Sequence, residues 1–428
     1  MNKTLKDLLA FLWASPTPFH AVETVKTRLQ KLQFGALAEV DPWDALAPGR
    51  YFSTYGDSAL IAFEVPRGKK VRGFRIVGAH TDSPNLRLKP NAEYVKEGYR
   101  QLGVEVYGGA LLNSWLDRDL GLAGRAMVET KTGLSSRLFR LDQPLLRIPQ
   151  LAIHLDRDVN EKGLVLNRQE HLPPIAGLAA SDAQGTLAAI ASQLGVKVEA
   201  VVSLDAMLFD TVEPAVGGAG GEFLFSGRLD NLAMCHAATH ALTASLGAQD
   251  QFVPVIALFD HEEVGSETAA GAHSAFLPRV LQRLAIRLGG SQDGAFRILA
   301  GSECVSADMA HAIHPNFVDR HEARHRPAIN QGPVIKNNSN QRYATSAATA
   351  ARFAMACKRA DVPVQQFVTR SDLPCGSTIG PITATLLGIP TVDVGNPMLS
   401  MHSIREMGGS RDPGYMIAAL GQFLRDAG

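Results

Sequence analysis

Hydrophobic residues follow two patterns along most of the chain, and each pattern predicts one kind of element. Three nearly continuous apolar runs predict buried strands over 74–79, 253–259 and 391–394. Because strands and helices alternate along the chain, we expect an α/β fold. Apolar residues at helical spacing, bounded by Gly, Asn or Asp, predict helices over 2–13, 20–32, 230–246, 276–287, 342–359, 380–387 and 412–426.

The stretch 86–226 has a different pattern. Apolar and polar residues alternate in short runs, such as 103–107 and 124–129, which predict half-exposed strands. A single Ala-rich helix is expected over 181–194, and glycine clusters follow at 217–221. We therefore expect a β-rich domain, 86–226, inserted into an α/β domain that is made of residues 1–85 and 227–428.

Composition and charge narrow the classes of function. The 428 residues include 42 Lys and Arg and 42 Asp and Glu, so no basic excess is available to neutralise a nucleic-acid backbone. No apolar run approaches the roughly 18 residues that a membrane span needs. The four cysteines lie far apart and form no CxxC, which is typical of reduced thiols in a cytoplasmic protein. P-loop, GxGxxG and GxSxG motifs are absent from the sequence.

The residues that could carry chemistry follow the apolar runs, where open α/β sheets place their functional crevice. His80 ends the first run, within GAHTDSP, and Asp82 follows two residues later. A carboxylate in that position can orient an imidazole that binds a metal. The alternative is a turn at the end of a strand, capped by Asp82 and Pro84.

Three further carboxylates are candidates for the same site. Glu262 and Glu263 come directly after the second run, and adjacent carboxylates repel each other. A dication would hold both, with one glutamate binding metal while the other takes a proton from water; otherwise the pair forms a solvated turn. Asp230 precedes an apolar helix, so it is either a metal ligand or the N-cap of that helix.

Histidines complete the set of candidates. Asp308, His311 and His314 recur every three residues, so one helical turn could present all three to a metal, unless they are a capping Asp and two partly buried histidines. His402 follows the third run in a Met- and Leu-rich loop, as a ligand or as a core residue. His321–His325 literally matches HExxH, but prolines bracket it and no apolar stripe accompanies it, so we do not expect a zincin site.

Together these candidates offer two histidines, three carboxylates that can bind a metal, and one more glutamate that is left to act as a base. This set suits a pair of dications that share one carboxylate and one water. Such a site is net positive, so it acidifies water and stabilises a tetrahedral oxyanion. Imidazole and carboxylate without thiolate suit zinc, with manganese or cobalt as alternatives. The residues alone thus predict a co-catalytic metallohydrolase.

At these residues the sequence resembles the aspartyl aminopeptidase family. The resemblance extends over almost the whole chain, which makes it highly specific. Its motifs, in order, are ASPTPFHAV (14–22), GAHTDSP (78–84), HLDRDVN (154–160), GRLDN (227–231), EEVGS (262–266), SADMAHAIHPN (306–316), GPVIK (332–336), QRYA (341–344), PCGSTIGP (374–381) and MHSIRE (401–406).

The resemblance implies a mixed-sheet metallopeptidase domain with helices on both faces, built from two chain segments. The inserted domain would serve in dimerisation and assembly, usually into a homododecamer. The resemblance also implies a role for each site residue: His80 and Asp308 would hold one metal, Glu263 and His402 the other, with Asp230 bridging them, Glu262 as general base and Asp82 orienting His80.

Two further residues receive roles from the resemblance. His154, in the inserted domain, would reach a neighbouring subunit's site and stabilise the tetrahedral intermediate. Alternatively it would bind zinc directly with His80 and His402, which leaves the carboxylates Asp230, Glu263 and Asp308 unexplained. Lys336 would face the first side chain of the substrate, where a cation suits Asp or Glu.

The expected activity is removal of N-terminal residues, acidic ones above all, from peptides with a free N-terminus. Glu262 would take a proton from the attacking water and pass it to the leaving amine. Two rival functions stay open. One is a related two-metal dipeptidase or deacylase that ignores a free amine, and the other is a catalytically silent self-assembling shell protein.

Overall fold

The computed structural model divides the chain into two compact units. The first comprises Met1–Asp82, Ala215–Met401 and Glu406–Gly428, and the second comprises Ser83–Pro214 and His402–Arg405. Residues 1, 44–45, 68–69, 182–183, 249–250 and 427–428 are outside the described part of the chain.

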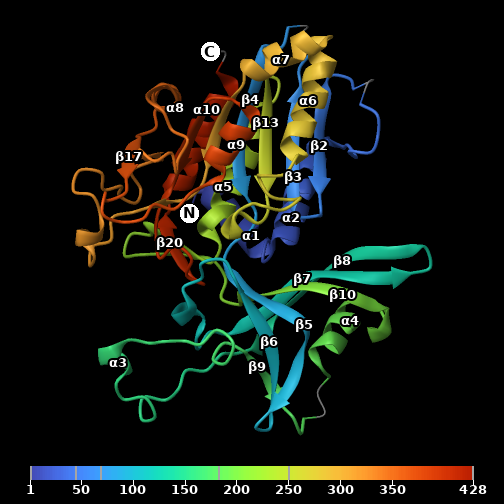
Figure 1. Cartoon of the computed structure of the whole chain (residues 1–428), viewed down its shortest axis with the longest axis vertical. Helices are drawn as coiled ribbons and strands as arrows, with labels where there is room; N and C mark the ends of the chain where they lie inside the picture. Colours follow the sequence, from blue (N-terminus) through green and yellow to red (C-terminus); the bar gives the residue numbers. More distant parts are fainter. Residues whose placement is uncertain (1, 44–45, 68–69, 182–183, 249–250, 427–428) are drawn as a thin grey trace. The chain divides into compact units, whose positions relative to one another are not determined.

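A mixed sheet of nine strands forms the centre of the first unit (Figure 1). Its middle strands β13, β4, β14 and β18 are mutually parallel, whereas β3 and β16 pair antiparallel to β13 and β18. The strand order is β1 (Gly35–Ala36), β2 (Gly49–Tyr55), β3 (Ala59–Val65), β13 (Phe252–Phe259), β4 (Gly73–His80), β14 (Glu303–Ala307), β18 (Thr391–Gly395), β16 (Val334–Asn337) and β17 (Gln365–Val368).

Helices cover both faces of this sheet, because the middle strands are apolar on both faces. Along β13, Ile256 and Leu258 pack on one side, and Val255 and Ala257 pack on the other. The first face carries α1 (Lys3–Ala14), α2 (Pro18–Lys31), α5 (Leu229–Ser245), α8 (Ala347–Arg359) and α10 (Asp412–Arg425). The second face carries α6 (Phe276–Gly289), α7 (Gln292–Ala300) and α9 (Ile379–Leu387).

Polar caps set where several helices begin. Asn2 accepts a hydrogen bond from the amide of Leu5 at the start of α1, and Thr17 precedes a proline at the first position of α2. Ser346 forms a capping box with Thr349, so α8 begins at residue 347 and not at the predicted 342. The seven helices and three strands predicted for this unit are otherwise confirmed to within a few residues.

A small second sheet belongs to the same unit. It has the order β11 (Ala215–Gly217), β12 (Phe223–Ser226), β20 (Glu406–Gly409), β19 (Pro397–Leu399) and β15 (Ala310–His311). Strands β11, β12 and β20 belong to segments that follow the second unit in sequence. They pair with β19 and β15, which follow β18 and β14. These segments carry several of the candidate residues, so this sheet fixes their course.

The second unit is built on an antiparallel sheet of six strands. Its order is β8 (Gly133–Leu146), β7 (Leu120–Thr130), β10 (Val201–Asp210), β5 (Asn85–Lys96), β6 (Tyr99–Tyr107) and β9 (Ile175–Leu178), accompanied by α3 (Val159–Lys162) and α4 (Thr186–Leu194). Alternate residues such as Leu120, Leu122 and Leu208 form its core. The expected fold class, a mixed-sheet α/β domain with a β-rich insertion, is confirmed; the helix expected from 181 begins at 186, and 182–183 lie outside the described residues.

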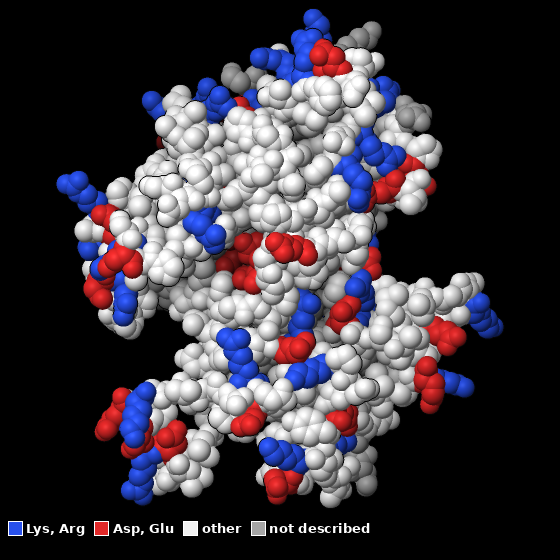
Figure 2. Space-filling view, in the orientation of Figure 1, with Lys and Arg blue, Asp and Glu red and all other residues white. Residues whose placement is uncertain are grey.

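Charged residues of both signs lie on the face of the molecule drawn in Figure 2. Lys and Arg are interspersed with Asp and Glu on the face drawn in Figure 2, as the equal counts of 42 suggest. Among the described residues, no helix is long and apolar enough to cross a membrane.

Candidate metal centre

Three parallel strands end at one edge of the large sheet and deliver the candidate residues there. His80 is the last residue of β4 and lies in register with Phe259, the last residue of β13. β14 runs parallel to β4 on its other side and ends at Ala307, one residue before Asp308. The rule that function gathers beyond the carboxyl ends of parallel strands therefore applies to His80, Asp308 and the glutamates after β13.

His80 is at the centre of a group of carboxylates. Its Nε2 lies 3.5 Å from Asp230 Oδ1, 3.5 Å from Asp308 Oδ1 and 3.8 Å from Glu262 Oε2. Two sets of ligand atoms, each within 4.8 Å of one another, share this imidazole. One set is His80, Asp230 and Glu263, and the other is His80, Glu262 and Asp308.

Asp82 holds the other side of the imidazole. The Nδ1 of His80 lies 3.0 Å from the carbonyl oxygen of Asp82 and 3.3 Å from its Oδ1. The same carboxylate accepts the backbone N–H groups of Glu262 and Glu263, each at 3.1 Å. Both His80 and Asp82 are buried. Nδ1 therefore faces a hydrogen-bond acceptor, and Nε2 faces the carboxylates.

The glutamates are placed by a short turn. His261 takes the left-handed conformation (φ 62°), and Glu262–Val264 form one turn of 3-10 helix, η3. The amides of both glutamates then point to Asp82, which lets both carboxylates turn toward His80. This arrangement is a specific structure and not the solvated acidic turn that was the alternative.

Asp230 does not cap α5. The N-cap position belongs to Arg228, and the backbone of Asp230 and Asn231 departs from helical dihedral angles, with a cis peptide bond between them. The amide of Asp230 donates to Glu406 Oε2 at 3.1 Å, and the side-chain amide of Asn231 donates to the carbonyl of Ala307 at 2.9 Å. The carboxylate of Asp230 is thereby directed toward His80.

The charges in this cluster need a cation to balance them. Burial raises the pKa of Glu262 well above its ordinary value; the positive charge of His80 opposes this shift, and the neighbouring Asp308, Glu263 and Asp82 add to it. Burial alone would lower the pKa of His80, but the surrounding carboxylates outweigh it and hold the pKa well above its ordinary value. Buried carboxylates converging on one imidazole are a donor set that fits divalent zinc.

The predicted helical turn through Asp308, His311 and His314 is wrong. The amides of Asp308, Ala310 and Ala312 donate to the carbonyls of Val394, Asn396 and Met398, so the segment is extended along the chain after β18. Strand pairing thus overrides the three-residue repeat. Only Asp308 reaches the cluster; the ring of His311 packs against Phe367, and the amide of His314 bonds to His321.

Lys336 lies beside the cluster and is buried, with 2% of its surface exposed. Its Nζ donates to the carbonyl of Met309 at 2.9 Å and lies 3.5 Å from Asp308 Oδ2. The ring of Tyr343 is 5.3 Å from this nitrogen. The ammonium group therefore adds one positive charge next to a candidate ligand.

His154 and His402 belong to the second unit. His154 is exposed, and the Nδ1 of His402 lies 3.1 Å from the carbonyl oxygen of Gly109. The HExxH segment is not helical, as expected, and the Nδ1 of His325 pairs with Glu322 at 2.6 Å.

Supporting residues of the cluster were not identified from the sequence. Glu406 and Asn231 hold the backbone around Asp230, and the thiol of Cys235 donates to the carbonyl of His80 at 2.9 Å. Glu406 and Asn231 stand within the motifs MHSIRE and GRLDN, so their places in those motifs were the available signal. Cys235 carries no such signal, because only helix packing brings it to His80.

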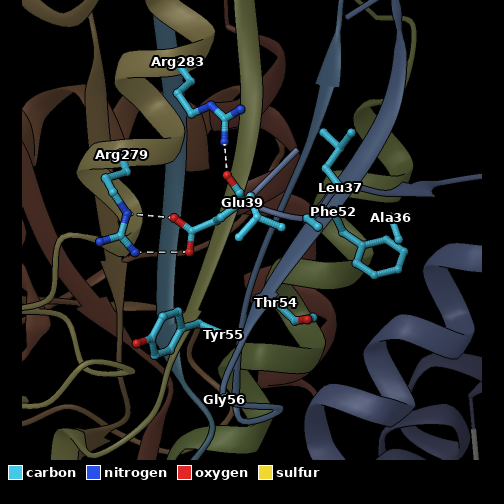
Figure 3. Close-up of a pocket in the computed structure, with 11 residues that line it drawn as sticks. Ala36, Leu37, Glu39, Phe52, Thr54, Tyr55, Gly56, Arg279 and Arg283 are labelled. Carbon is cyan, nitrogen blue, oxygen red and sulfur yellow. Dashed lines mark hydrogen bonds and ion pairs between the residues drawn. The ribbon is translucent and has the colours of Figure 1, made fainter. Parts of the chain in front are cut away.

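A separate pocket of about 780 Å³ lies against β1, β2 and α6 (Figure 3). Its charged groups bind one another: Arg279 pairs with the carboxylate of Glu39 at 2.7 Å, and Arg283 donates to the carbonyl of Glu39. The carboxylate in its lining is that of Glu39, and Arg279 engages it, so the described residues that line this pocket include no group of His, Cys, Asp or Glu side chains comparable to the His80 cluster. The chemistry therefore belongs to the His80 cluster.

Comparison with known proteins identifies the family of this chain. Residues 11–424 match the family model described as aminopeptidase I zinc metalloprotease (M18). The chain is 48% identical over 423 residues to a probable M18 family aminopeptidase 2 of Streptomyces coelicolor, covering 98% of this chain and 97% of that protein. The corresponding protein of Pseudomonas aeruginosa is also 48% identical, over 424 residues, with the same coverage.

Solved structures give the same result. The chain superposes with a TM-score of 0.94 on Ape4 in a complex with Nbr1, at 42% identity, covering 99% of this chain and 85% of that one. It superposes on the yeast mApe1 dodecamer with a TM-score of 0.85 at 28% identity, covering 99% and 97%. The chain therefore belongs to the M18 aminopeptidase family of zinc metalloproteases and is a metalloaminopeptidase, a hydrolase that acts on peptide bonds.

Proposed function

We propose that this aminopeptidase removes acidic N-terminal residues from peptides and that each subunit uses two divalent metals, most simply zinc. The observation that carries the proposal is the buried convergence of His80 with Asp230, Asp308 and the two glutamates after β13. One imidazole among so many carboxylates matches a pair of dications better than one, because a single dication leaves an excess of buried negative charge.

The ligands divide between two metals. His80 and Asp308 would hold one metal, Glu263 and His402 the other, and Asp230 would bridge them. Alternatively, His154 joins His80 and His402 as a direct ligand. Bound dications of this kind supply Lewis acidity, which polarises a peptide carbonyl and acidifies water.

The protein's own groups then move the proton. Glu262 Oε accepts a proton from the attacking water, while the water oxygen forms a bond to the carbonyl carbon. When the C–N bond breaks, Glu262 returns the same proton to the leaving amine nitrogen. Asp82 is a positioning residue, because it holds both the His80 ring and the backbone of the glutamate turn.

The preference for acidic residues is assigned to Lys336. Its ammonium is the cationic side chain bound next to Asp308, and a cation there favours a substrate carboxylate. In the proposed assembly, a homododecamer formed through the second unit, His154 of a neighbouring subunit completes the site and steadies the tetrahedral intermediate. The dodecameric mApe1 to which this chain is similar supports that proposal.

A panel of reporter substrates tests the function. Aspartyl and glutamyl reporters should be cleaved faster than leucyl and alanyl reporters, and an N-acetylated aspartyl reporter should not be cleaved. Chelation should abolish turnover, and zinc, manganese or cobalt should restore it to differing extents. Equal cleavage of the aspartyl and leucyl reporters would overturn the acidic preference, and cleavage of the acetylated reporter would overturn the requirement for a free N-terminus. The rival functions, a dipeptidase or deacylase and a silent shell protein, are set aside by the family to which the chain belongs.

A further inference from the structure

A second cluster of candidate metal ligands lies among α1, α2 and α5, on one face of the large sheet and outside the His80 cluster. His236 and His240 stand four residues apart on α5, so they occupy the same side of that helix one turn apart. Asp7 of α1 faces them, and Arg28 of α2 completes the group. Nothing in the proposed peptidase mechanism uses these side chains.

One ring nitrogen of each histidine and one carboxylate oxygen of this cluster meet at one place. The Nε2 atoms of His236 and His240 each lie 2.8 Å from the same oxygen, Asp7 Oδ2. The three ligand atoms lie within 4.8 Å of one another. The two rings are 4.4 Å apart between centroids. Two imidazole nitrogens and one carboxylate oxygen are three ligands of a tetrahedral transition-metal site, which leaves a fourth position for water.

We propose that Asp7, His236 and His240 form an additional binding site for a transition-metal dication of the zinc, nickel and copper group, separate from the peptidase metals. This proposal goes beyond the proposed function and does not depend on it. Imidazole-rich sites with one carboxylate select this group over magnesium or calcium, which take oxygen ligands.

The protonation states favour metal binding. Hydrogen bonding from His236 outweighs burial and, with Arg28 and His240, holds the pKa of Asp7 well below its ordinary value, so this carboxylate is ionised. Burial lowers the pKa of His236 to about 4, so its ring is neutral at pH 7. Its Nδ1 is buried and has no hydrogen-bond partner among the described residues. That nitrogen can therefore carry the ring proton when Nε2 binds a metal: the hydrogen bond between Nε2 and Asp7 is exchanged for the bond to the metal, and no hydrogen bond of Nδ1 is lost.

Arg28 is the internal competitor for this site. Its Nη1 lies 2.7 Å from Asp7 Oδ2 and 3.4 Å from His240 Nε2, so the guanidinium occupies the place of a cation. The guanidinium also lies 5.0 Å from the ring of Phe11, and a quarter of its side chain is exposed. Metal binding therefore requires Arg28 to turn toward solvent. Its charge sets a moderate affinity and favours the metals that bind imidazole most tightly.

The position of the cluster lets a metal ion reach it and determines what metal binding does to the fold. His240 and Asp7 are each about one-third exposed, so a hydrated ion can reach them. A metal held by α1 and α5 together binds the folded state only and raises its stability by mass action. Because α5 begins at the backbone that directs Asp230, the same metal would also fix the N-terminal helix to the element that carries a peptidase ligand.

Equilibrium dialysis of the zinc-saturated holoenzyme tests the site. The wild type should bind one zinc per subunit more than His240→Ala, and additional zinc should raise the thermal midpoint of the wild type but not that of His240→Ala. His171→Ala is the matched control for loss of a surface imidazole and should keep the wild-type count, because His171 lies in the second unit. Arg28→Met should bind the extra zinc about tenfold more tightly, because a positive charge within hydrogen-bonding distance is removed.

Two further measurements keep the test decisive. Asp7→Asn nearly preserves the shape of the side chain and should lose the extra zinc, even if His240→Ala folds poorly. Copper added to the wild type should give an electron paramagnetic resonance spectrum with two coupled imidazole nitrogens, and Asp7→Asn should weaken it. Equal zinc counts in the wild type, His240→Ala and Asp7→Asn, with no tightening in Arg28→Met, would overturn the proposal. None of these measurements depends on peptidase activity, so the outcome is independent of the proposed function.

Discussion

The carboxylate of Asp82 is bound to the backbone of Glu262: its Oδ1 accepts that amide at 3.1 Å, although 180 residues separate the two in sequence. Its second oxygen accepts the amide of Glu263, and Oδ1 also lies 3.3 Å from the Nδ1 of His80. One buried carboxylate thus joins the ends of the neighbouring strands β4 and β13 (Figure 1). The imidazole and the glutamate pair are consequently positioned by the same group.

This relationship predicts the effect of Asp82→Asn. An asparagine offers one oxygen acceptor, so one glutamate amide would face an NH₂ group and lose its bond. We expect metal affinity to fall by about 10–100-fold, as for other partners of metal ligands, and kcat to fall even at saturating metal. Competition with a chelator measures the first effect and steady-state kinetics the second. Unchanged metal affinity would show that Asp82 does not position the ligands.

Glu262→Gln tests the general base. The amide keeps the shape of the side chain but cannot take up a proton, so kcat should fall by about 10²–10⁴-fold while the metal content stays that of the wild type. Metal analysis and kcat with the best reporter substrate measure the two effects. Glu267→Gln, an exposed glutamate in the same loop, is the matched control and should retain full activity. Substantial residual turnover in Glu262→Gln would remove that residue from the role.

The elements that were predicted well are those whose burial is complete. β4 and β13 are apolar on both faces, so their sequence shows a continuous apolar run whatever their partners are. Since polar residues follow such strands directly, His80 and the glutamates could be proposed as neighbours. The order of the strands in the sheet was not readable, because it depends on contacts between distant segments.

The features that the sequence predicted wrongly or did not predict are determined by tertiary packing. The segment after β14 has a helical repeat of polar residues, but its amides pair with the chain after β18, and hydrogen bonding there decides its conformation. The burial of Lys336 could not be expected from a charged residue in GPVIK, because the partners that satisfy it come from Met309 and Asp308. The approach of Asp7 to His236 likewise requires α1 to pack on α5.

Lys336→Met tests how acidic substrates are recognised. If the ammonium attracts the substrate carboxylate, kcat/KM for an aspartyl reporter should fall about 10–100-fold more than for a leucyl reporter. Lys358→Met, an exposed lysine at the end of α8, is the matched control and should leave both values unchanged. Equal losses for the two reporters would show instead that Lys336 acts through Asp308, and metal affinity would then fall as well.

The pH dependence of stability should reveal Asp412, a buried residue at the start of α10. Burial raises its pKa from 3.8 to about 7, against the amides of Asn330 and Gly332 that donate to it. The folded state therefore holds a proton that the unfolded state releases near pH 4. The contribution of this carboxyl group to the free energy of unfolding is fully present below pH 4 and is lost as the pH rises to 7. At 1.36 kcal/mol per unit, the loss is at most about 4 kcal/mol.

Asp412→Asn cannot titrate, so the difference in thermal midpoint between this variant and the wild type should change with pH. The variant should be clearly less stable than the wild type at pH 5, where the wild type holds its proton, and the gap should narrow or reverse at pH 8. Asp293→Asn is the matched control, because Asp293 stands in the first turn of α7 but is exposed, and its difference from the wild type should not follow this course. A gap for Asp412→Asn that is equal at pH 5 and pH 8 would show that this carboxyl group titrates alike in the folded and unfolded states.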